Sequence, residues 1–426
     1  MSLKRRAFIN ISALAAATSF VGINSIKAAN QHTAENKFPY ERKSITLDVL
    51  PISVKEREAR VAKAQSLLAK NKMEALLLDC GTALKYFTGI SWGSSERTMV
   101  AIIPAKGGVK YICPGFEEAR LREQITIGNE VYAWQEDENP YLVIAGILKD
   151  AGIVAGNIAI EERVRFFIVD GIKKASPHLN FVSGDAVTIP CRMIKSAAEL
   201  VLLQKASDIT VAAIKAGISQ LKEGMSPGDL SAIINAAHGQ MDGDADFALC
   251  LFGEASAFPH GTTKPATLKK GDIVLMDCGC RVHGYCSDIT RTVVFGAVPT
   301  KRQQQIWNLE KQAQAAGFAA AKIGAACQDV DAAARGVITA AGFGPGYKLP
   351  GLPHRTGHGI GMDGHEWGNM VKGNKQLLEP GMCFSIEPTI SIVGEFGVRF
   401  EDCVYMTAEG PKWFSQPAKS LQEPFG

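Results

Sequence analysis

The sequence lacks most features that would assign it to a specialised class of protein. Its 46 Lys and Arg residues nearly balance 43 Asp and Glu, so a net charge of +3 indicates neither nucleic acid nor a membrane surface as a partner. The ten scattered cysteines contain no Cys-x-x-Cys pair, which argues against a zinc knuckle and a disulfide framework. Short-period repeats, low-complexity tracts and Walker-type phosphate loops are also missing. The remaining composition is typical of an ordinary soluble enzyme.

Residues 1–29 are predicted to be a targeting segment rather than part of the fold. The run from Lys4 to Ile9, KRRAFI, resembles the twin-arginine export signal, in which two arginines precede an aromatic and an aliphatic residue. The weakly apolar stretch that follows is too short and too polar for a stable membrane span. Ala28 or Ala29 offers a small residue for cleavage. We therefore expect export to the periplasm and no stable membrane anchor.

The rest of the chain is long enough for two domains. Between residues 45 and 190, strand-like runs alternate with amphipathic helical ones, which predicts a small α/β domain. Ser196 followed by Glu199 forms a capping box, which indicates the start of a long helix. We place the domain boundary there, so that the second domain covers residues 195–426. A Gly- and His-rich stretch at 342–368 is predicted to be a loop.

Four carboxylates and one histidine lie in apolar or glycine-rich segments of the second domain: Asp277, Asp288, His358, Glu387 and Glu401. Acidic residues seldom occupy strand-like apolar runs unless a cation compensates their charge. Such an oxygen-rich set suits two hard divalent cations better than one structural zinc, which prefers four Cys or His ligands. The sequence therefore predicts a two-metal hydrolase.

The carboxylates form two pairs with similar settings. Asp277 and Asp288 are eleven residues apart, and Glu387 and Glu401 are fourteen apart. Each pair falls on consecutive predicted strands that follow a pair of predicted helices. This pattern predicts a domain of two related halves whose strands converge on one site.

With these motifs, residues 195–426 resemble the catalytic domain of the creatinase, prolidase and methionine aminopeptidase family, metallopeptidase family M24, which has the pita-bread fold. All five ligand positions occur in the family's order. Residues 45–190 are similar in length and pattern to the N-terminal domain of the prolidase and aminopeptidase P branch. The resemblance implies an α/β fold of the α+β kind. A pita-bread catalytic domain with internal pseudo-twofold symmetry would follow a smaller creatinase-like α/β domain.

The resemblance also implies roles for the five ligands. Asp277 would bind one metal ion, while Asp288 and Glu401 would each bridge two. His358 would bind a single ion, and Glu387 would be a ligand that also transfers protons. Manganese suits these donors, with cobalt or zinc as alternatives.

Four further residues match the family on the substrate side of the site. His260 would face the substrate, and His365 would donate a hydrogen bond to the developing oxyanion. His354 and Arg399 resemble the set found in the proline-directed branch, and Arg399 would orient Glu401. Thr389 stands where the family often has glycine, which leaves the shape of the pocket open.

The expected activity is hydrolysis of Xaa-Pro bonds in small peptides by a metal-bridging hydroxide, as an Xaa-Pro dipeptidase or an aminopeptidase P. By resemblance, the protein would form a homodimer or a higher homo-oligomer. Two alternatives stay open. One is a metal-dependent hydrolase or lyase of the same fold that acts on a small non-peptide metabolite. The other is a non-catalytic binding module of this fold.

Overall fold

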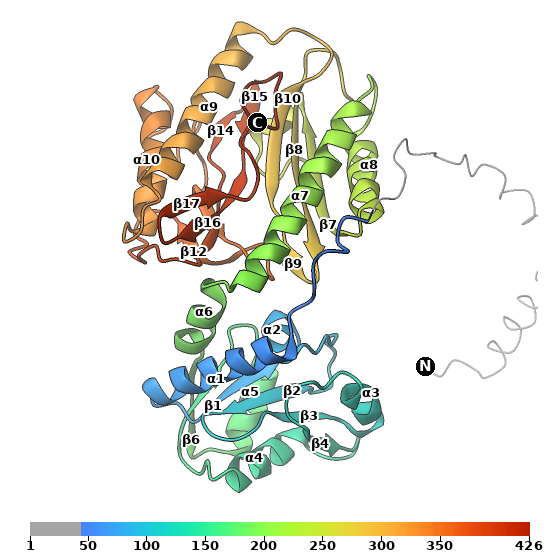
Figure 1. The fold of residues 1–426 in the computed structure, drawn as a ribbon, viewed down its shortest axis with the longest axis vertical. Coiled ribbons are helices and arrows are strands. Elements are labelled where there is room, and N and C mark those ends of the chain that lie inside the picture. Colours follow the sequence, from blue (N-terminus) through green and yellow to red (C-terminus); the bar gives the residue numbers. More distant parts are fainter. Residues whose placement is uncertain (1–43) are drawn as a thin grey trace, which may run out of the picture. The chain divides into compact units, whose positions relative to one another are not determined.

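The structure is a computed structural model and describes residues 44–426, which form one compact unit (Figure 1). The predicted targeting segment at 1–29 lies outside these residues. No helix within 44–426 is both long and apolar enough to cross a membrane.

A six-stranded mixed sheet forms the N-terminal part of this unit, with the strand order β4-β3-β2-β1-β5-β6. Strands β1, β5 and β6 are parallel to one another, as are β3 and β4, whereas β2 is antiparallel to both its neighbours. The strands are β1 (Ala75–Asp79), β2 (Val100–Pro104), β3 (Lys110–Pro114), β4 (Glu130–Trp134), β5 (Gly156–Ile160) and β6 (Leu179–Ser183).

Strand β1 is buried along its whole length because helices cover both faces of the sheet. Alternate side chains point to opposite faces, so Leu76 and Leu78 join one hydrophobic cluster while Ala75 and Leu77 join another. Helix α1 packs on the first face, and α4 and α5 pack on the second (Figure 1). The helices of this part are α1 (Val54–Lys70), α2 (Thr82–Thr88), α3 (Glu118–Arg122), α4 (Pro140–Asp150) and α5 (Phe166–Ala175).

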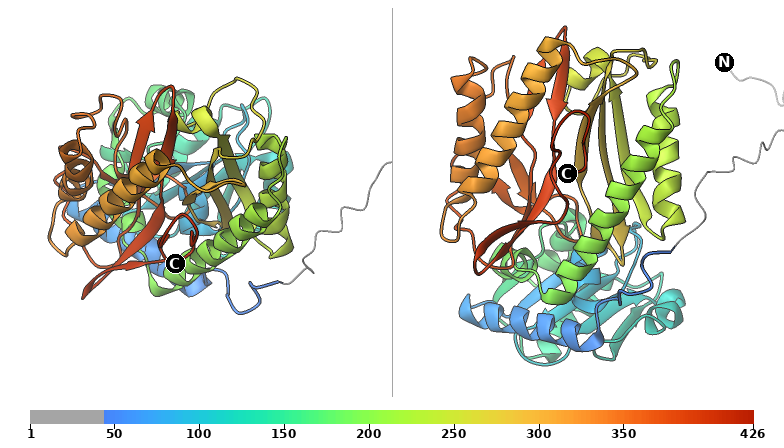
Figure 2. Two further views of the ribbon diagram at one scale, coloured as in Figure 1. Left: turned by 90° about the horizontal axis from the view of Figure 1, so that it is seen from above. Right: turned by 45° about the horizontal axis from the view of Figure 1, so that its top comes forward.

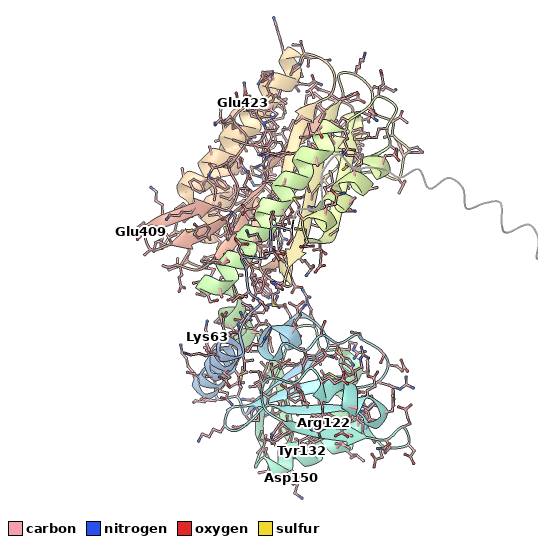
Figure 3. All side chains as sticks on the ribbon, turned by 45° about the vertical axis from the view of Figure 1, so that its right-hand side comes forward. Lys63, Arg122, Tyr132, Asp150, Glu409 and Glu423 are labelled. Carbon is pink, nitrogen blue, oxygen red and sulfur yellow. The ribbon has the colours of Figure 1, made fainter. Side chains whose placement is uncertain are left out.

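Helix α6 (Asp185–Met193) and a short extended segment lead into α7 (Ala197–Ser219). The predicted capping box is present: the Glu199 N–H donates to the Ser196 hydroxyl, and the Ser196 N–H donates to the Glu199 carboxylate. On the other side of the junction, Lys63 of α1 donates to the carbonyl of Pro190 in α6 at 2.7 Å. Figure 3 labels Lys63 on the side of the N-terminal sheet nearest α6.

The C-terminal part contains two layered halves, as predicted. Helices α7 and α8 (Pro227–Gln240) pack on the sheet β10-β8-β7, and α9 (Lys301–Ala320) and α10 (Cys327–Ala340) pack on the second group of strands. Figure 2 shows the strands of both halves between the two helix pairs. The first sheet contains β7 (Asp244–Phe252), β8 (Ile273–Val282), β9 (Tyr285–Cys286) and β10 (Ile289–Val294).

The second half contains a five-stranded sheet of order β12-β11-β13-β16-β17 and a separate hairpin, β14-β15. Strand β11 lies inside the stretch 342–368, which the sequence predicts to be a loop, and β12 begins in it at Glu366, so that prediction is wrong for those residues. Glycine has a low strand propensity, but pairing with β13 holds β11 in the sheet. The strands are β11 (Gly357–Gly359), β12 (Glu366–Met370), β13 (Cys383–Ile386), β14 (Thr389–Ile392), β15 (Phe396–Arg399), β16 (Asp402–Thr407) and β17 (Gly410–Trp413).

All ten cysteine thiols are free. Nine are buried, and the tenth, Cys80 at the end of β1, is partly exposed. Burial raises the pKa of several of these thiols, that of Cys80 to about 12. The cysteines therefore act as small apolar side chains of the core.

Candidate metal centre

The five predicted ligands converge where the two halves of the C-terminal part meet. Asp277 lies in β8, and Asp288 immediately precedes β10. His358 lies in β11, Glu387 follows β13, and Glu401 lies between β15 and β16. A single backbone bridge between Thr290 and Glu401 joins the two halves at this point.

Two glycines place His358 deep between neighbouring strands. A Cβ atom on Gly357 would lie 1.9 Å from the carbonyl oxygen of Ser385, and one on Gly359 would lie 2.0 Å from that of Trp367. Only glycine permits so close an approach. The glycines of this segment therefore allow β11 to bring His358 to the carboxylates.

The donor atoms lie close enough to share metal ions. His358 Nε2 is 3.1 Å from Glu387 Oε1, 3.6 Å from Asp288 Oδ2 and 3.9 Å from Glu401 Oε1. Three overlapping sets each have their donor atoms within 4.8 Å of one another: Asp277, Asp288 and Glu401; His358, Glu387 and Glu401; and Asp288, His358 and His365.

The charge of this cluster also fits divalent cations. Glu401 Oε1 and Asp277 Oδ1 are buried and have no hydrogen-bond partner. Burial and the neighbouring carboxylates raise the pKa values of Asp288 and Glu401 well above their ordinary range. Buried carboxylate oxygens without partners are costly unless a cation compensates them, so the residues present fit a site for metal ions.

Glu387 differs from the other acids of the cluster. Burial alone would raise its pKa, but the adjacent His358, together with His354 and Arg399, lowers it to about 2. Glu387 is therefore ionised at neutral pH.

Arg399 holds two of the carboxylates from behind. Its Nη2 donates to Asp277 Oδ2, and its Nε donates to the Thr290 hydroxyl at 3.2 Å. That hydroxyl in turn donates to Glu401 Oε2 at 2.9 Å. The sequence predicts that Arg399 orients Glu401. In the structure Arg399 acts on Glu401 indirectly, through the hydroxyl of Thr290. Thr290 is missing from the predicted residues, although its spacing of two from Asp288 places both on one face of an extended chain.

A cavity of about 470 Å³ opens onto the cluster. All five ligands line it, together with the predicted residues His260, His354, His365 and Arg399 and with Arg355. Arg355 is missing from the predicted residues, although it lies between His354 and His358 in the same motif.

His365 stacks on His358, with ring centroids 3.8 Å apart. Its Nδ1 is 2.8 Å from Arg355 Nη2. A guanidinium can only donate hydrogen bonds, so Nδ1 accepts and the neutral ring carries its proton on Nε2. Burial, together with the nearby His358 and Arg355, lowers the pKa of His365 to about 4. His365 is therefore a neutral hydrogen-bond donor on the cavity wall.

His354 has hydrogen-bond partners at both ring nitrogens. Nδ1 lies 2.7 Å from the Arg355 carbonyl oxygen, and Nε2 lies 3.0 Å from the Thr389 hydroxyl. Nδ1 must donate to the carbonyl, so Nε2 of the neutral ring accepts from Thr389. The residue that departs from the family pattern, Thr389, thus fixes the ring of His354. His260 is exposed on the same cavity.

Comparison with known proteins agrees with this geometry. Residues 60–194 match the Creatinase/Prolidase N-terminal domain, and residues 201–408 match Metallopeptidase family M24. The protein named "Putative dipeptidase YkvY" of Bacillus subtilis (strain 168) is 33% identical over 365 residues, which cover 85% of this chain and 99% of that relative. The chain belongs to metallopeptidase family M24. It is a metal-dependent hydrolase, and the alternative of a non-catalytic binding module is set aside.

Solved structures of a dipeptidase and a prolidase share the fold. Dipeptidase PepE from Mycobacterium ulcerans has a TM-score of 0.80 and 30% identity, over 87% of this chain and 99% of that one. A prolidase from Thermococcus sibiricus has a TM-score of 0.77 and 31% identity, and the match covers 84% of this chain and 97% of that one. These similarities confirm the predicted pita-bread catalytic domain and creatinase-like N-terminal domain of this M24 peptidase.

Proposed function

We propose that this M24 peptidase hydrolyses Xaa-Pro bonds in short peptides, chiefly dipeptides, at a centre of two divalent cations. The observation that carries the proposal is the set of overlapping donor groups on the wall of one cavity. A cavity of about 470 Å³ is of a size suited to a small ligand. Relatives named as dipeptidases and prolidases support the substrate class.

The donor sets support a division of labour among the ligands. Among these carboxylates, Asp288 and Glu401 each belong to two of the three sets, so they are the ones that two ions would share. His358 also belongs to two sets, but its Nδ1 lies 3.0 Å from the Gly359 carbonyl oxygen, which leaves Nε2 for a single ion. Asp277, His358 and Glu387 would each bind one ion. When bound, the cations polarise the scissile carbonyl and make water a better nucleophile near neutral pH. Manganese suits this oxygen-rich set, with cobalt or zinc as alternatives.

The other residues would bind, orient and transfer protons. Nε2–H of His365 is free to donate to the carbonyl oxygen as negative charge develops on it. Glu387 is ionised at neutral pH, so it can accept a proton from water and pass it to the leaving nitrogen. Arg399 and Thr290 keep Asp277 and Glu401 in place, while Thr389 and His354 shape the wall beside them.

The test is release of free amino acids from a panel of peptides with manganese, cobalt or zinc added. The panel pairs Ala-Pro and Leu-Pro with the matched controls Ala-Ala and Ala-Pro-Ala. Hydrolysis of the Xaa-Pro dipeptides alone supports the proposal. Hydrolysis of the tripeptide as well indicates an aminopeptidase P. No hydrolysis, with two ions bound per chain, contradicts the proposal and favours a small non-peptide metabolite as the substrate.

We further propose that the protein is exported to the periplasm and, separately, that it forms a homodimer or a higher homo-oligomer. The support for export is the sequence around Arg5 and Arg6. Replacing both arginines by lysine preserves the charge and is expected to retain the full chain in the cytoplasm. Periplasmic recovery of that variant at the wild-type level would contradict export. Light scattering of the purified protein measures its molar mass in solution, and the mass of a single chain would contradict the oligomer.

A further inference from the structure

A second cluster of charged side chains surrounds the hairpin formed by β11, β12 and the loop between them. This hairpin carries His358 on its first strand and His365 at the end of its loop, immediately before β12. The shape of the loop therefore decides whether the two rings stack as they do, 3.8 Å apart.

The Glu366 side chain binds the backbone of this loop. Its Oε1 accepts hydrogen bonds from the backbone N–H groups of Met362 at 3.0 Å and Asp363 at 3.2 Å. The carboxylate lies so close to Gly361 that a Cβ atom there would be 2.6 Å from both of its oxygens. The loop is thus folded around one carboxylate.

Two cationic side chains bind the same carboxylate from the other side: Arg192 near the end of α6, and Lys195 between α6 and α7. Arg192 Nη2 lies 2.6 Å from Glu366 Oε1, and Lys195 Nζ lies 2.9 Å from Oε2. The Arg192, Lys195 and Glu366 side chains are at most 10% exposed. Burial alone would raise the pKa of Glu366, but Lys195 and Arg192 lower it to about 2, so the group is ionised.

Asp363 connects the loop to the N-terminal sheet. Its Oδ2 lies 2.6 Å from Arg192 Nη2. Its Oδ1 accepts from the Thr82 hydroxyl at 2.7 Å and lies 3.0 Å from Arg163 Nη1. Thr82 begins α2 and Arg163 follows β5, so both belong to the N-terminal part of the chain.

We propose that these six residues form an interdomain clamp that holds His365 over His358: Thr82, Arg163, Arg192, Lys195, Asp363 and Glu366. None of the six lines the cavity at the metal centre, so they are positioning residues that act through the loop. The N-terminal part thereby contributes to the rate of the reaction without contacting the substrate. The inference rests on the proposed function only for the role of His365 in turnover.

The experiment measures hydrogen–deuterium exchange and turnover on the metal-loaded full chain. The variants are Arg192→Gln, the conservative Arg192→Lys, and Thr82→Val, which removes one hydroxyl. Arg302→Gln is the matched control, because Arg302 forms an exposed ion pair with Glu395. Arg192→Gln is expected to speed exchange in residues 360–368 and to lower kcat about tenfold or more, since small misplacements of a catalytic group are costly.

KM is expected to change less than twofold, because His365 acts on charge that develops in the transition state. Arg192→Lys should recover most of the rate. Thr82→Val should lower kcat less, by about threefold, and should also speed exchange in residues 360–368. A clamp that only stabilises the fold would lower the melting temperature without changing kcat per folded molecule.

Wild-type exchange in residues 360–368 for both Arg192→Gln and Thr82→Val would overturn the proposal, as would wild-type kcat despite faster exchange. If Arg192→Gln does not fold, Thr82→Val decides. If the wild-type protein hydrolyses no peptide of the panel, the proposed function fails, but local exchange in residues 360–368 still decides whether the clamp holds the loop.

Discussion

The metal centre and the interdomain clamp are both built from acidic side chains, but their charges are compensated differently. In the metal centre four carboxylates meet a single guanidinium, that of Arg399, and two buried oxygens have no partner. The pKa values of Asp288 and Glu401 are raised by burial and by neighbouring carboxylates. This cluster is incomplete without added positive charge.

In the clamp, two carboxylates meet three cationic side chains. The pKa of Glu366 is lowered to about 2 because its ion pairs outweigh the cost of burial. The negative charges of the clamp are therefore compensated by side chains of the protein itself, without a metal ion. The difference teaches that a buried acid marks a metal site only when its neighbours leave its charge uncompensated.

The largest effect is expected from removing one of the two carboxylates that we propose bridge the metal ions. Asp288→Ala or Glu401→Ala should lower kcat/KM by about 1,000-fold or more, because the metal ions supply several kcal/mol of transition-state stabilisation. Peptide kinetics and metal analysis per chain check this, with Glu395→Gln at an exposed ion pair as the control. Near-normal turnover would contradict the assigned ligands.

Neutral replacements should change the stability of the metal-free protein in opposite directions at the two clusters. Glu366→Gln removes the ion-pair partner of the buried Lys195 and one of the two partners of Arg192, so the free energy of unfolding should fall by about 3 kcal/mol. Asp288→Asn removes the repulsion between Asp288 and the neighbouring carboxylates, so the free energy of unfolding should rise by about 1 kcal/mol. Urea unfolding of both variants measures the difference. A change of the same sign in both would remove the contrast between the clusters.

The clamp should also weaken in acid. Because the pKa of Glu366 is about 2 in the folded protein, against an ordinary value of 4.5, the unfolded chain binds this proton first as the pH falls. The stabilisation by Glu366 is complete above about pH 4.5 and is lost towards pH 2, by about 3 kcal/mol in total. Unfolding of the metal-free protein across this range should be less pH-dependent in Glu366→Gln. Parallel curves would show that Glu366 is not ion-paired in solution.

A smaller effect is expected at Thr290. Thr290→Val removes the hydroxyl that donates to Glu401 and accepts from Arg399, so metal affinity should fall about tenfold. Thr290→Ser keeps the hydroxyl and should bind metal nearly as tightly as the wild type. Competition with a chelator measures both dissociation constants. Equal affinities for the two variants would show that Thr290 does not support the ligand.

The five residues that the structure brings together at the candidate metal centre could be selected from the sequence because each lies in its own short motif. Asp277 and Glu401 stand out as acids in strand-like runs, and His358 stands out between glycines. Thr290 could have been found as well, because the alternation of an extended chain places it beside Asp288.

The clamp could not be predicted in this way. Thr82 and Asp363 are 281 residues apart, and neither lies in a pattern that marks it as paired. Such a contact depends on how the N-terminal sheet docks on the hairpin. Strand β11 was missed for a similar reason, since its glycines gain strand structure only by pairing with β13.

The free cysteines have a practical consequence. Nine of the ten thiols are buried and Cys80 is only partly exposed, so the folded protein should react slowly with alkylating reagents. Each unfolded molecule, by contrast, exposes ten reactive groups. A short pulse of iodoacetamide followed by mass spectrometry would therefore count unfolded molecules in a mixture, and no cysteine has to be introduced for the measurement.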